Sequence, residues 1–386
     1  MKYSISILLA TTLTFSLCIN ANAETKSIMG SGPTRGTLDV SLRNEVNASV
    51  GRTLDWLAAN QKENGSWSNE KYPALTALAL RPFILSNRPE DKKVIDKGIS
   101  FIKSCVNKDG GIYHKVPMVK GGGLSNYNTA ICMITLHASK RPDLIKIIQN
   151  ARKFIADGQH LGGDEYHGGF GYDKSTKRAY TDLLNTYHSV KAMRITQDVE
   201  DLRPASEKRV DIDWDASIKF ITAIQNKEDA GEADANGFFY KPGQSKAGTT
   251  TNSTGKIVFR SYGSMTYTGL LSLMYSNVSR DDPRIMSAFH WSARHWSLEE
   301  NPGMGKQGMY FFYNILTKSL DAFGQDLVPR PDNKNIDWRR EVASKILELQ
   351  KTDKNGHGYW INENSRFWES DPVLTTAYSV LALQTL

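Results

Sequence analysis

Two side chains that could exchange protons lie close together near the middle of the chain. Asp182 and His188 both fall in residues 181–195, where apolar residues are spread so evenly that we expect a helix buried on all sides. A carboxyl group there can stay protonated at neutral pH and donate its proton, with the imidazole as its partner. Two other interpretations stay open: Asp182 could cap the helix, and His188 could be a buried histidine with its hydrogen bonds made.

Aromatic side chains recur near the starts of the helices that we expect to be buried. We predict that Tyr267 acts together with Asp182 and His188. We predict that seven others bind a ligand: Tyr127, Tyr180, Tyr187, Tyr262, Tyr310, Tyr313 and Trp368. Their ring faces suit an apolar polyene or a passing cation. The alternative is that half or more of them only pack between helices.

We expect no metal and no cofactor. One loop holds four residues of metal-binding types: His160, Asp164, Glu165 and His167. These residues could bind a metal, but we favour the alternative that the loop is a solvated polar segment. Cys105 and Cys132 are too few for a structural zinc site of four ligands. Whether these two cysteines form a disulfide depends on how closely their Cα atoms approach, and the sequence leaves this open.

The helices that must position these residues come in two kinds that alternate six times along the chain. The first kind has one apolar stripe and a polar face, which predicts a half-exposed helix. The second kind is apolar nearly all round, which predicts a helix buried on all sides. The first kind covers residues 44–61, 91–106, 144–158, 213–225, 283–296 and 338–350, and the second covers 74–85, 126–138, 181–195, 265–275, 309–323 and 372–386. Six exposed and six buried helices predict an outer barrel around an inner barrel.

Each first helix ends in a turn rich in glycine, and the first turn has a characteristic spacing. Trp56 and Leu57 are followed by Gln61, Gly65 and Trp67, and looser copies occur in the later repeats. This spacing resembles the Gln-Trp motif of the squalene–hopene cyclase and protein prenyltransferase superfamily. The resemblance covers residues 44–386 and implies an all-α fold, an α/α toroid of six hairpins. It also implies a ligand in the barrel lumen, against aromatic side chains.

The sequence departs from both branches of that superfamily. Hopene cyclases carry an Asp-x-Asp-Asp-Thr-Ala motif at the start of an inner helix. In the matching stretch here only Asp182 is an acid, and Leu184 stands where the proton donor would be. The protein prenyltransferases need an Asp, Cys and His set around zinc, which this chain lacks. Classical squalene cyclisation and protein prenylation are therefore not expected.

The beginning of the chain has the pattern of a secretory signal peptide. Lys2 supplies the positive charge, residues 5–19 the apolar core, and Ala21-Asn22-Ala23 the cleavage site. We expect cleavage after Ala23 and export, either to a periplasm or out of the cell. The apolar run is short for a membrane span and no second one follows, so we expect no transmembrane segment.

We expect residues 24–43 to be a linker and residues 44–386 to form one toroid domain. Residues 243–255 contain no apolar side chain except Ala247 and predict a flexible insertion, either a flap or a tolerated loop. The net charge is +7. Lysine and arginine are spread along the chain without a basic stripe, so nucleic acid is not an expected partner.

These features favour an exported toroid that binds an apolar, isoprenoid-like small molecule in its lumen. Two alternatives from other classes stay open. The toroid rim could bind a protein partner without catalysis. The barrel could instead act on glycans, which needs two carboxyl groups on one cleft. Asp182, Glu369 and Asp371 are the acids that could supply them.

Overall fold

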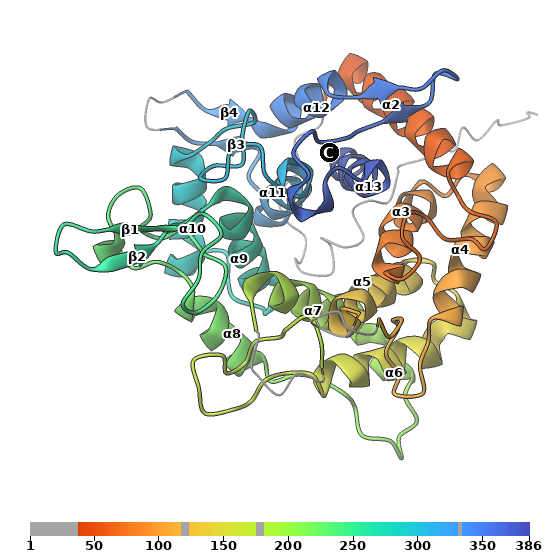
Figure 1. Cartoon of the computed structure of the whole chain (residues 1–386), viewed down its shortest axis with the longest axis horizontal. Helices are drawn as coiled ribbons and strands as arrows, with labels where there is room; N and C mark the ends of the chain where they lie inside the picture. The colour runs from red at the N-terminus through yellow and green to blue at the C-terminus, as the bar shows by residue number, and fades with distance from the viewer. Residues whose placement is uncertain (1–37, 117–122, 175–180, 331–333) are drawn as a thin grey trace, which may run out of the picture.

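The fold is an α/α toroid, a closed ring of helical hairpins. The computed structural model describes residues 38–116, 123–174, 181–330 and 334–386. The expected signal peptide and Tyr180 lie outside these residues. Within these described residues twelve α-helices, α2 to α13, alternate between an outer and an inner ring (Figure 1). The outer helices are α2 (Val40–Ala59), α4 (Lys92–Ser104), α6 (Ile145–Ala156), α8 (Trp214–Ala223), α10 (Pro283–Arg294) and α12 (Trp338–Glu348).

The inner ring closes on itself. Its helices are α3 (Pro73–Ser86), α5 (Ser125–Ala138), α7 (Leu183–Ile195), α9 (Gly263–Tyr275), α11 (Met309–Phe323) and α13 (Pro372–Leu383). Each of them contacts the one before and the one after, and α13 returns to α3. In the outer ring α12 likewise contacts α2. Each inner helix therefore packs between two others, which explains why its sequence is apolar on nearly every side.

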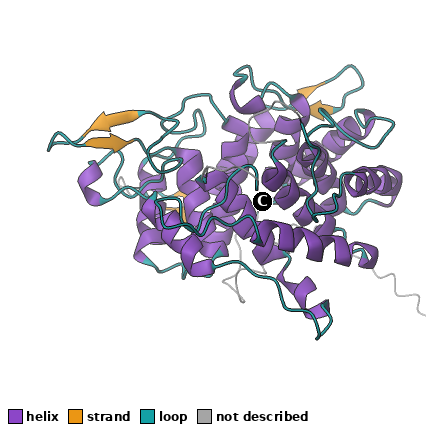
Figure 2. Ribbon diagram, turned by 60° about the horizontal axis from the view of Figure 1, so that its bottom comes forward, coloured by secondary structure: helices purple, strands orange, loops and turns teal. Residues whose placement is uncertain are grey.

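Short elements decorate the ring. Three antiparallel strand pairs are present in the described residues: β1 (Thr249–Thr251) with β2 (Ile257–Phe259), β3 (Leu327–Val328) with β4 (Ile336–Asp337), and β5 (Lys351–Thr352) with β6 (Gly358–Tyr359). Five 3-10 helices join the larger elements: Pro89–Asp91, Pro142–Leu144, Gln197–Leu202, Glu228–Ala230 and Arg366–Trp368. The β1–β2 hairpin projects from the helical body (Figure 2). The expected flexible insertion, residues 243–255, thus contains a paired strand, because Thr249 to Thr251 bond to a partner beyond the insertion.

The glutamine of the repeated turn ties neighbouring outer helices together. The Gln61 side-chain amide donates to the carbonyl of Gly65 in its own turn and to Val94 of α4. The Gln225 side-chain amide likewise donates to the carbonyl of Asn236 in its own turn and to the carbonyl of Arg284 of α10. Gln350 donates to Ser49 of α2 and so joins the last hairpin to the first. One side chain thus satisfies carbonyl groups on two successive repeats.

The tryptophan of the motif fixes the turn against its own hairpin. The Trp67 indole is fully buried and donates to the carbonyl of Leu57 at 2.7 Å. Trp360 does the same in the last repeat, where it donates to Ile346 at 2.8 Å. No helix in the described part of the chain is long and apolar enough to cross a membrane.

Candidate functional site

Asp182 lies at the start of α7 and caps that helix. One carboxylate oxygen accepts the backbone N–H of Asn185 at 2.9 Å, and the other accepts the Asn185 side-chain amide at 2.8 Å. The backbone N–H of Asp182 donates to Phe170, which fixes the residue against the preceding turn. The side chain is buried, with 2% of its surface exposed. The capping role expected as one alternative is therefore present.

The same carboxyl group is also a buried acid. Burial raises its pKa from 3.8 to about 6, although the bonds from Asn185 and an interaction with the Tyr240 phenol pull the pKa down. Tyr172 and Tyr262 also lie within electrostatic reach of this carboxyl group. Asp182 is thus about half protonated at pH 6 and about one-tenth protonated at pH 7. It lies among phenol groups at the start of α7.

A row of aromatic rings leads from this acid along α7. Tyr127 of α5 is half-buried and packs on Tyr172, with ring centres 6.0 Å apart. It also meets the edge of His188 at 5.0 Å. The ring centre of His188 lies 4.9 Å from that of Tyr187, and the ring centre of Tyr187 lies 6.3 Å from that of Tyr275. These contacts join α5, α7 and α9 on the side that faces the space inside the inner ring, which we call the lumen.

His188 is a neutral imidazole in this row. Burial, together with the nearby Lys191 and Lys318, lowers its pKa well below 6.5. Its Nε2 atom is buried and has no hydrogen-bond partner in the described structure. His188 therefore does not appear beside Asp182 as an acid–base partner. His188 lies further along α7 than Asp182, near Tyr127, Tyr187 and Lys191.

A second acid lies near the start of α11. Glu369 is 1% exposed and accepts the backbone N–H of Phe311 at 2.8 Å and the side-chain amide of Asn362 at 2.7 Å. Burial raises its pKa to about 7. Trp368 beside it is half-exposed, has a positive φ of 67°, and meets Tyr72 edge-on at 4.9 Å. Glu369 and Trp368 thus place an acid and an exposed ring at the rim.

Three of the predicted site residues pack between the rings instead. Tyr267 interacts with Ser292 of the outer helix α10 and lies against Phe312. Tyr313 donates to the carbonyl of Leu298, and Tyr310 donates to Ile361. The hydroxyl groups of Tyr310 and Tyr313 bond connecting segments, and that of Tyr267 interacts with helix α10. The catalytic role of Tyr267 stays a prediction. The three tyrosines carry the packing role that was the alternative for such aromatic residues.

Two residues of the site escaped the sequence analysis. Tyr172 and Tyr240 end the Gly-rich turns that precede α7 and α9, and both surround Asp182. A usable signal was present, because both tyrosines follow a Gly-Phe pair at the same point of their repeats. Both tyrosines reach Asp182 because successive turns come together at one end of the barrel. The spacing of residues within a single repeat does not predict that approach.

The described residues contain no group of three or more His, Cys, Asp or Glu that could hold a metal. In the polar loop His160 Nε2 pairs with Asp164 at 2.8 Å. Cys105 and Cys132 are both free and buried. No disulfide therefore joins them in the structure.

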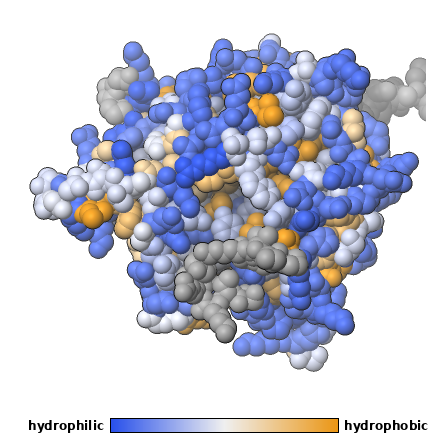
Figure 3. Space-filling view, viewed as in Figure 1, coloured by the Kyte–Doolittle hydropathy of each residue, from blue (hydrophilic) through white to orange (hydrophobic). Residues whose placement is uncertain are grey.

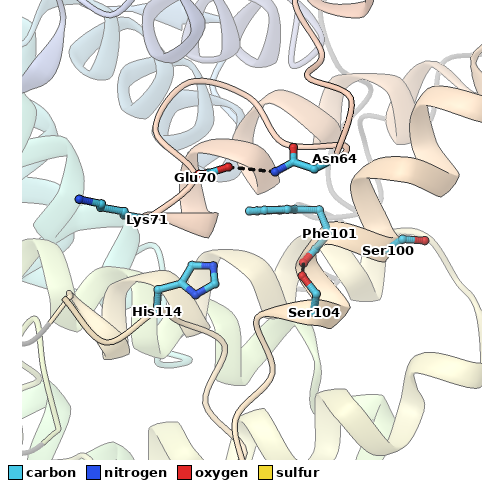
Figure 4. Close-up of a pocket in the computed structure, with 7 residues that line it drawn as sticks. All are labelled: Asn64, Glu70, Lys71, Ser100, Phe101, Ser104 and His114. Atoms are coloured by element: carbon cyan, nitrogen blue, oxygen red, sulfur yellow. Dashed lines mark hydrogen bonds between the residues drawn. The ribbon is translucent and has the colours of Figure 1, made fainter.

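A surface groove of about 550 Å³ between α4 and the first turn offers a different candidate (Figure 4). Glu70 is the acidic residue among those that line this groove. Its carboxylate accepts a hydrogen bond from the side-chain amide of Asn64 at 2.9 Å. His114 approaches the Cys105 sulfur at 3.3 Å, as in a thiol–imidazole pair. Burial, however, raises the pKa of Cys105 to about 11, so the thiol stays protonated. This groove lacks an activated nucleophile, and the lumen remains the better site.

On the face seen in Figure 3 hydrophilic side chains cover most of the surface, and smaller neutral and hydrophobic areas come to view both near the middle and at the edges.

These features define a closed α/α toroid with a buried acid among aromatic side chains. Neither a protein-family model nor a curated protein matches the sequence. Among solved structures, the type II terpene cyclase MstE from Scytonema in its apo form is similar, with a TM-score of 0.53 and 11% identity, over 89% of this chain and 98% of that one.

Two glycan-acting enzymes are similar to a comparable degree. The GH76A α-1,6-mannanase from Salegentibacter sp. HEL1_6 aligns with a TM-score of 0.50 and 12% identity, over 89% of this chain and 98% of that one. A novel α-amylase from Clostridium perfringens aligns with a TM-score of 0.52 and 12% identity, over 87% and 97%. At this identity the comparisons establish the toroid fold, which is shared by both kinds of enzyme.

Proposed function

We propose that the chain is an exported toroid that binds an apolar, isoprenoid-like molecule in its lumen and donates a proton to it from Asp182. The observation that carries this proposal is the raised pKa of Asp182, about 6, beside Tyr172, Tyr240 and Tyr262. Proton donation requires a carboxyl group whose pKa is raised toward the working pH, so that a protonated fraction persists there. MstE, a cyclase of similar fold that has been solved with a geranylgeranyl substrate, supports the choice of ligand class.

The surrounding residues suit this chemistry. When the proton moves to a double bond of the ligand, the carboxylate left behind is stabilised by the two bonds from Asn185. The positive charge formed on the ligand faces the rings of Tyr127 and Tyr172, which favour a cation. Loss of a proton from the ligand completes the isomerisation or cyclisation, and return of a proton to Asp182 resets the site.

A second function is favoured by Glu369. This acid has a pKa raised to about 7 and lies beside the exposed Trp368, an arrangement that suits a general acid next to a sugar-binding ring. The mannanase and the amylase of similar fold make a glycan the alternative substrate. In this alternative Asp182 and Glu369 would be the two carboxyl groups.

One experiment separates the two functions. The protein is incubated with geranylgeraniol and squalene on one side, and with α-1,6-mannan and starch on the other, and products are followed by mass spectrometry. We expect isomerised or cyclised prenyl products that vanish in Asp182→Asn and persist in Glu369→Gln. Release of sugars that depends on Glu369 would instead establish the glycan function. If neither substrate class binds or reacts, both proposals fail and the rim remains as an interaction surface for a protein.

Export is a separate proposal that rests on the first 23 residues of the sequence. It is tested by expressing the full chain in a Gram-negative host and measuring the mass of the protein from the periplasmic fraction. We expect the mature chain to begin at Glu24. An uncleaved chain in the cytosol would contradict this proposal and would leave the luminal site unaffected.

A further inference from the structure

A cleft of about 1210 Å³ opens at the end of the molecule where the inner helices end. It is lined by the last turns of α3, α5 and α7, by the first turns of the outer helices α4 and α6, and by the 3-10 helix Gln197–Leu202. Arg194, in the last turn of α7, comes twelve residues after Asp182, or about 18 Å further along the helix. The cleft therefore lies between the two helical rings, away from the proposed acid.

The floor of this cleft is apolar. Side chains from four helices contribute to it: Ile84 and Leu85 of α3, Ile95 of α4, Ile145 and Ile148 of α6, and Ile195 of α7. The first four are half-buried and the last two are buried. Such a floor offers apolar surface to an occupant that can reach into the cleft.

The acids of the lining are already engaged by basic side chains of the same lining. Three contacts account for them: Asp96 with Arg141 at 3.0 Å, Asp198 with His137 at 2.7 Å, and Asp201 with Arg209 at 2.7 Å. These acids are therefore committed, and they leave the charge of the other basic residues in the described lining uncompensated.

Two basic side chains of the lining, Lys140 and Arg194, make no ion pair in the described part of the chain. The Arg194 guanidinium donates to the carbonyl of Tyr275 at 2.7 Å and to the side chain of Gln197 at 2.9 Å. A guanidinium carries five N–H groups, so others remain available to a ligand. The Lys140 side chain, just beyond the end of α5, is exposed. One fixed and one adaptable cation thus stand above the apolar floor.

The ends of the helices explain only part of this arrangement. Helices α5 and α7 both end here, and their carbonyl ends attract cations such as Lys140 and Arg194. Asp211 also lies within electrostatic reach of Arg194, but it is not among the lining residues. Neither attraction calls for an apolar floor beside the cations. The two features together suit a ligand that has an anionic end and an apolar chain.

We propose that this cleft binds a fatty acid, with the alkyl chain on the apolar floor and the carboxylate at Arg194 and Lys140. A guanidinium can bind both oxygens of a carboxylate, and an ammonium group adds a further charge-assisted hydrogen bond. The cleft exceeds the roughly 300–1,000 Å³ of typical small-molecule sites, so a long flexible chain fits. This site goes beyond the proposed function and does not depend on it.

A free fatty acid suits the shape better than a membrane or a second copy of the chain. Both of those would need large apolar side chains that project from the surface. Of the large apolar residues in the lining, Leu202 is the one that is mostly exposed, at 62%. The others lie partly or wholly covered, where a slender chain can enter and a broad surface cannot.

The test compares decanoate with decanol, which share the chain and differ in charge. Binding to the full protein is measured by isothermal titration calorimetry at pH 7.5. We expect decanoate to bind about tenfold more tightly than decanol, because only decanoate can accept charge-assisted hydrogen bonds from both cations. Equal binding of the two, or no binding of decanoate, would overturn the proposal.

Two variants remove the cations, Lys140→Gln and Arg194→Gln. We expect each to weaken the binding of decanoate about three- to fivefold and to leave that of decanol unchanged. Lys140 is exposed, so its variant should fold even if the variant of Arg194 does not. Lys219→Gln, at an exposed lysine of α8 outside the lining, is the matched control for loss of one charge.

A third variant, Ile145→Glu, places an acid in the floor. Ile145 is the first residue of α6, where the helix dipole favours a negative charge, so the variant should fold. We expect it to weaken the binding of decanoate at least about tenfold, since two negative charges would then share the cleft. Val40→Glu is the matched control, because Val40 is the first residue of α2 and 78% exposed.

The remaining outcomes distinguish the cleft from other places and other occupants. Asp182→Asn should bind decanoate as the unaltered protein does. If that variant loses decanoate while the three cleft variants keep it, the ligand lies in the lumen and the cleft proposal is overturned. Sedimentation of the protein with phosphatidylglycerol vesicles, or a dimer in size-exclusion chromatography, that Ile145→Glu abolishes while free decanoate does not bind would assign the cleft to a membrane or to a second copy.

Discussion

At the scale of single residues, Asp182 combines two properties that usually exclude each other. A carboxylate that caps a helix is normally charged, and the helix dipole together with the N–H of Asn185 favours that charged form. Burial acts in the opposite direction and prevails, because the pKa rises from 3.8 to about 6. The cap fixes the position of the carboxyl group, and burial keeps it partly protonated. A positioned acid of this kind is what the proposed proton donation needs.

The pH dependence of stability tests this balance. Because its folded pKa lies above its unfolded pKa, Asp182 stabilises the fold below pH 3.8, and this contribution is lost as the pH rises through 6. The loss amounts to about 3 kcal/mol for a shift of roughly two units. Asp182→Asn keeps a good capping residue and cannot titrate. We expect its free energy of unfolding, relative to the unaltered protein, to rise by about 2–2.5 kcal/mol between pH 4 and pH 7.

Urea unfolding at several pH values measures this difference. Comparing the two proteins removes the contribution of Glu369, whose pKa is raised to about 7. A constant difference between them over this range would show that Asp182 is an ordinary charged cap and would remove the proposed acid.

The turn glycines differ in how much stability the protein should lose when they are replaced by alanine. Gly168 has a φ of 90°, and a Cβ atom there would lie 1.9 Å from the carbonyl oxygen of Ala216 on α8. Gly356 has a similar φ of 78°, but a Cβ atom there would meet nothing within 4 Å. We expect Gly356→Ala to cost about 1 kcal/mol for its backbone conformation alone. We expect Gly168→Ala to cost at least about 3 kcal/mol, because the turn must also move away from α8.

Thermal and chemical unfolding of these two variants gives the comparison. Equal losses of stability would show that the turn after α6 is free to move, and that the approach of Gly168 to α8 does not hold the two repeats together.

At the scale of elements, the glutamines of the turns explain how each hairpin is placed against the next. Gln225 donates to the carbonyl groups of Asn236 and Arg284, which belong to successive repeats. We expect Gln225→Ala to lower the free energy of unfolding by about 1–3 kcal/mol, since two carbonyl groups lose their donor. Gln197 is exposed and bonds only its neighbour Arg194, so Gln197→Ala serves as the control. A loss no larger than that of the control would mean that the motif glutamine is dispensable.

The positions of the helices were predictable because each carries its own signal. The stripe of α4 and the uniform apolarity of α13 place both helices within two or three residues of their observed ends. The β1–β2 hairpin was not predictable, since Thr249 to Thr251 are polar and pair through their backbones with Ile257 to Phe259. Backbone pairing leaves little trace in the side chains of so short a strand.

The site was only partly predictable, for a similar reason. Tyr127 and His188 stand at expected helix positions and do meet, with their ring centres 5.0 Å apart, whereas Asp182 caps the start of α7. Tyr267 stands at an equivalent position, but it turns toward α10. Apolarity all round a helix does not say which face meets the lumen and which meets the outer ring.

At the scale of the whole molecule, the lumen is chemically different at its two ends. The starts of the inner helices bring together N–H groups, and their positive ends are met by Asp182 and Glu369. About 12–14 Å further along, the wall carries Arg81, Lys191 and Lys318. Two buried acids thus occupy the end of the inner ring where the helices start.

The closure of the ring makes the last hairpin essential to all the others. Helix α13 fills the gap between α11 and α3, and α12 contacts α2 on the outside. Gln384 of the last turn donates to the carbonyl of Pro82 in α3, and Gln350 donates to Ser49 in α2. A chain that ends before Trp338 would therefore expose the apolar flanks of α3 and α11 and lose the bonds that join the two ends of the fold.

We expect such a truncated chain, without residues 338–386, to be insoluble, because two inner-helix flanks evolved for burial would face water. The control removes residues 252–256, the exposed turn of the β1–β2 hairpin, which lies outside the ring. That shortened chain should stay soluble and unfold cooperatively near the temperature of the full protein. Soluble fractions and thermal melts of both chains decide the matter. If the chain without its last hairpin is soluble and melts in one cooperative step, the six hairpins stack as independent units and closure contributes little to the fold.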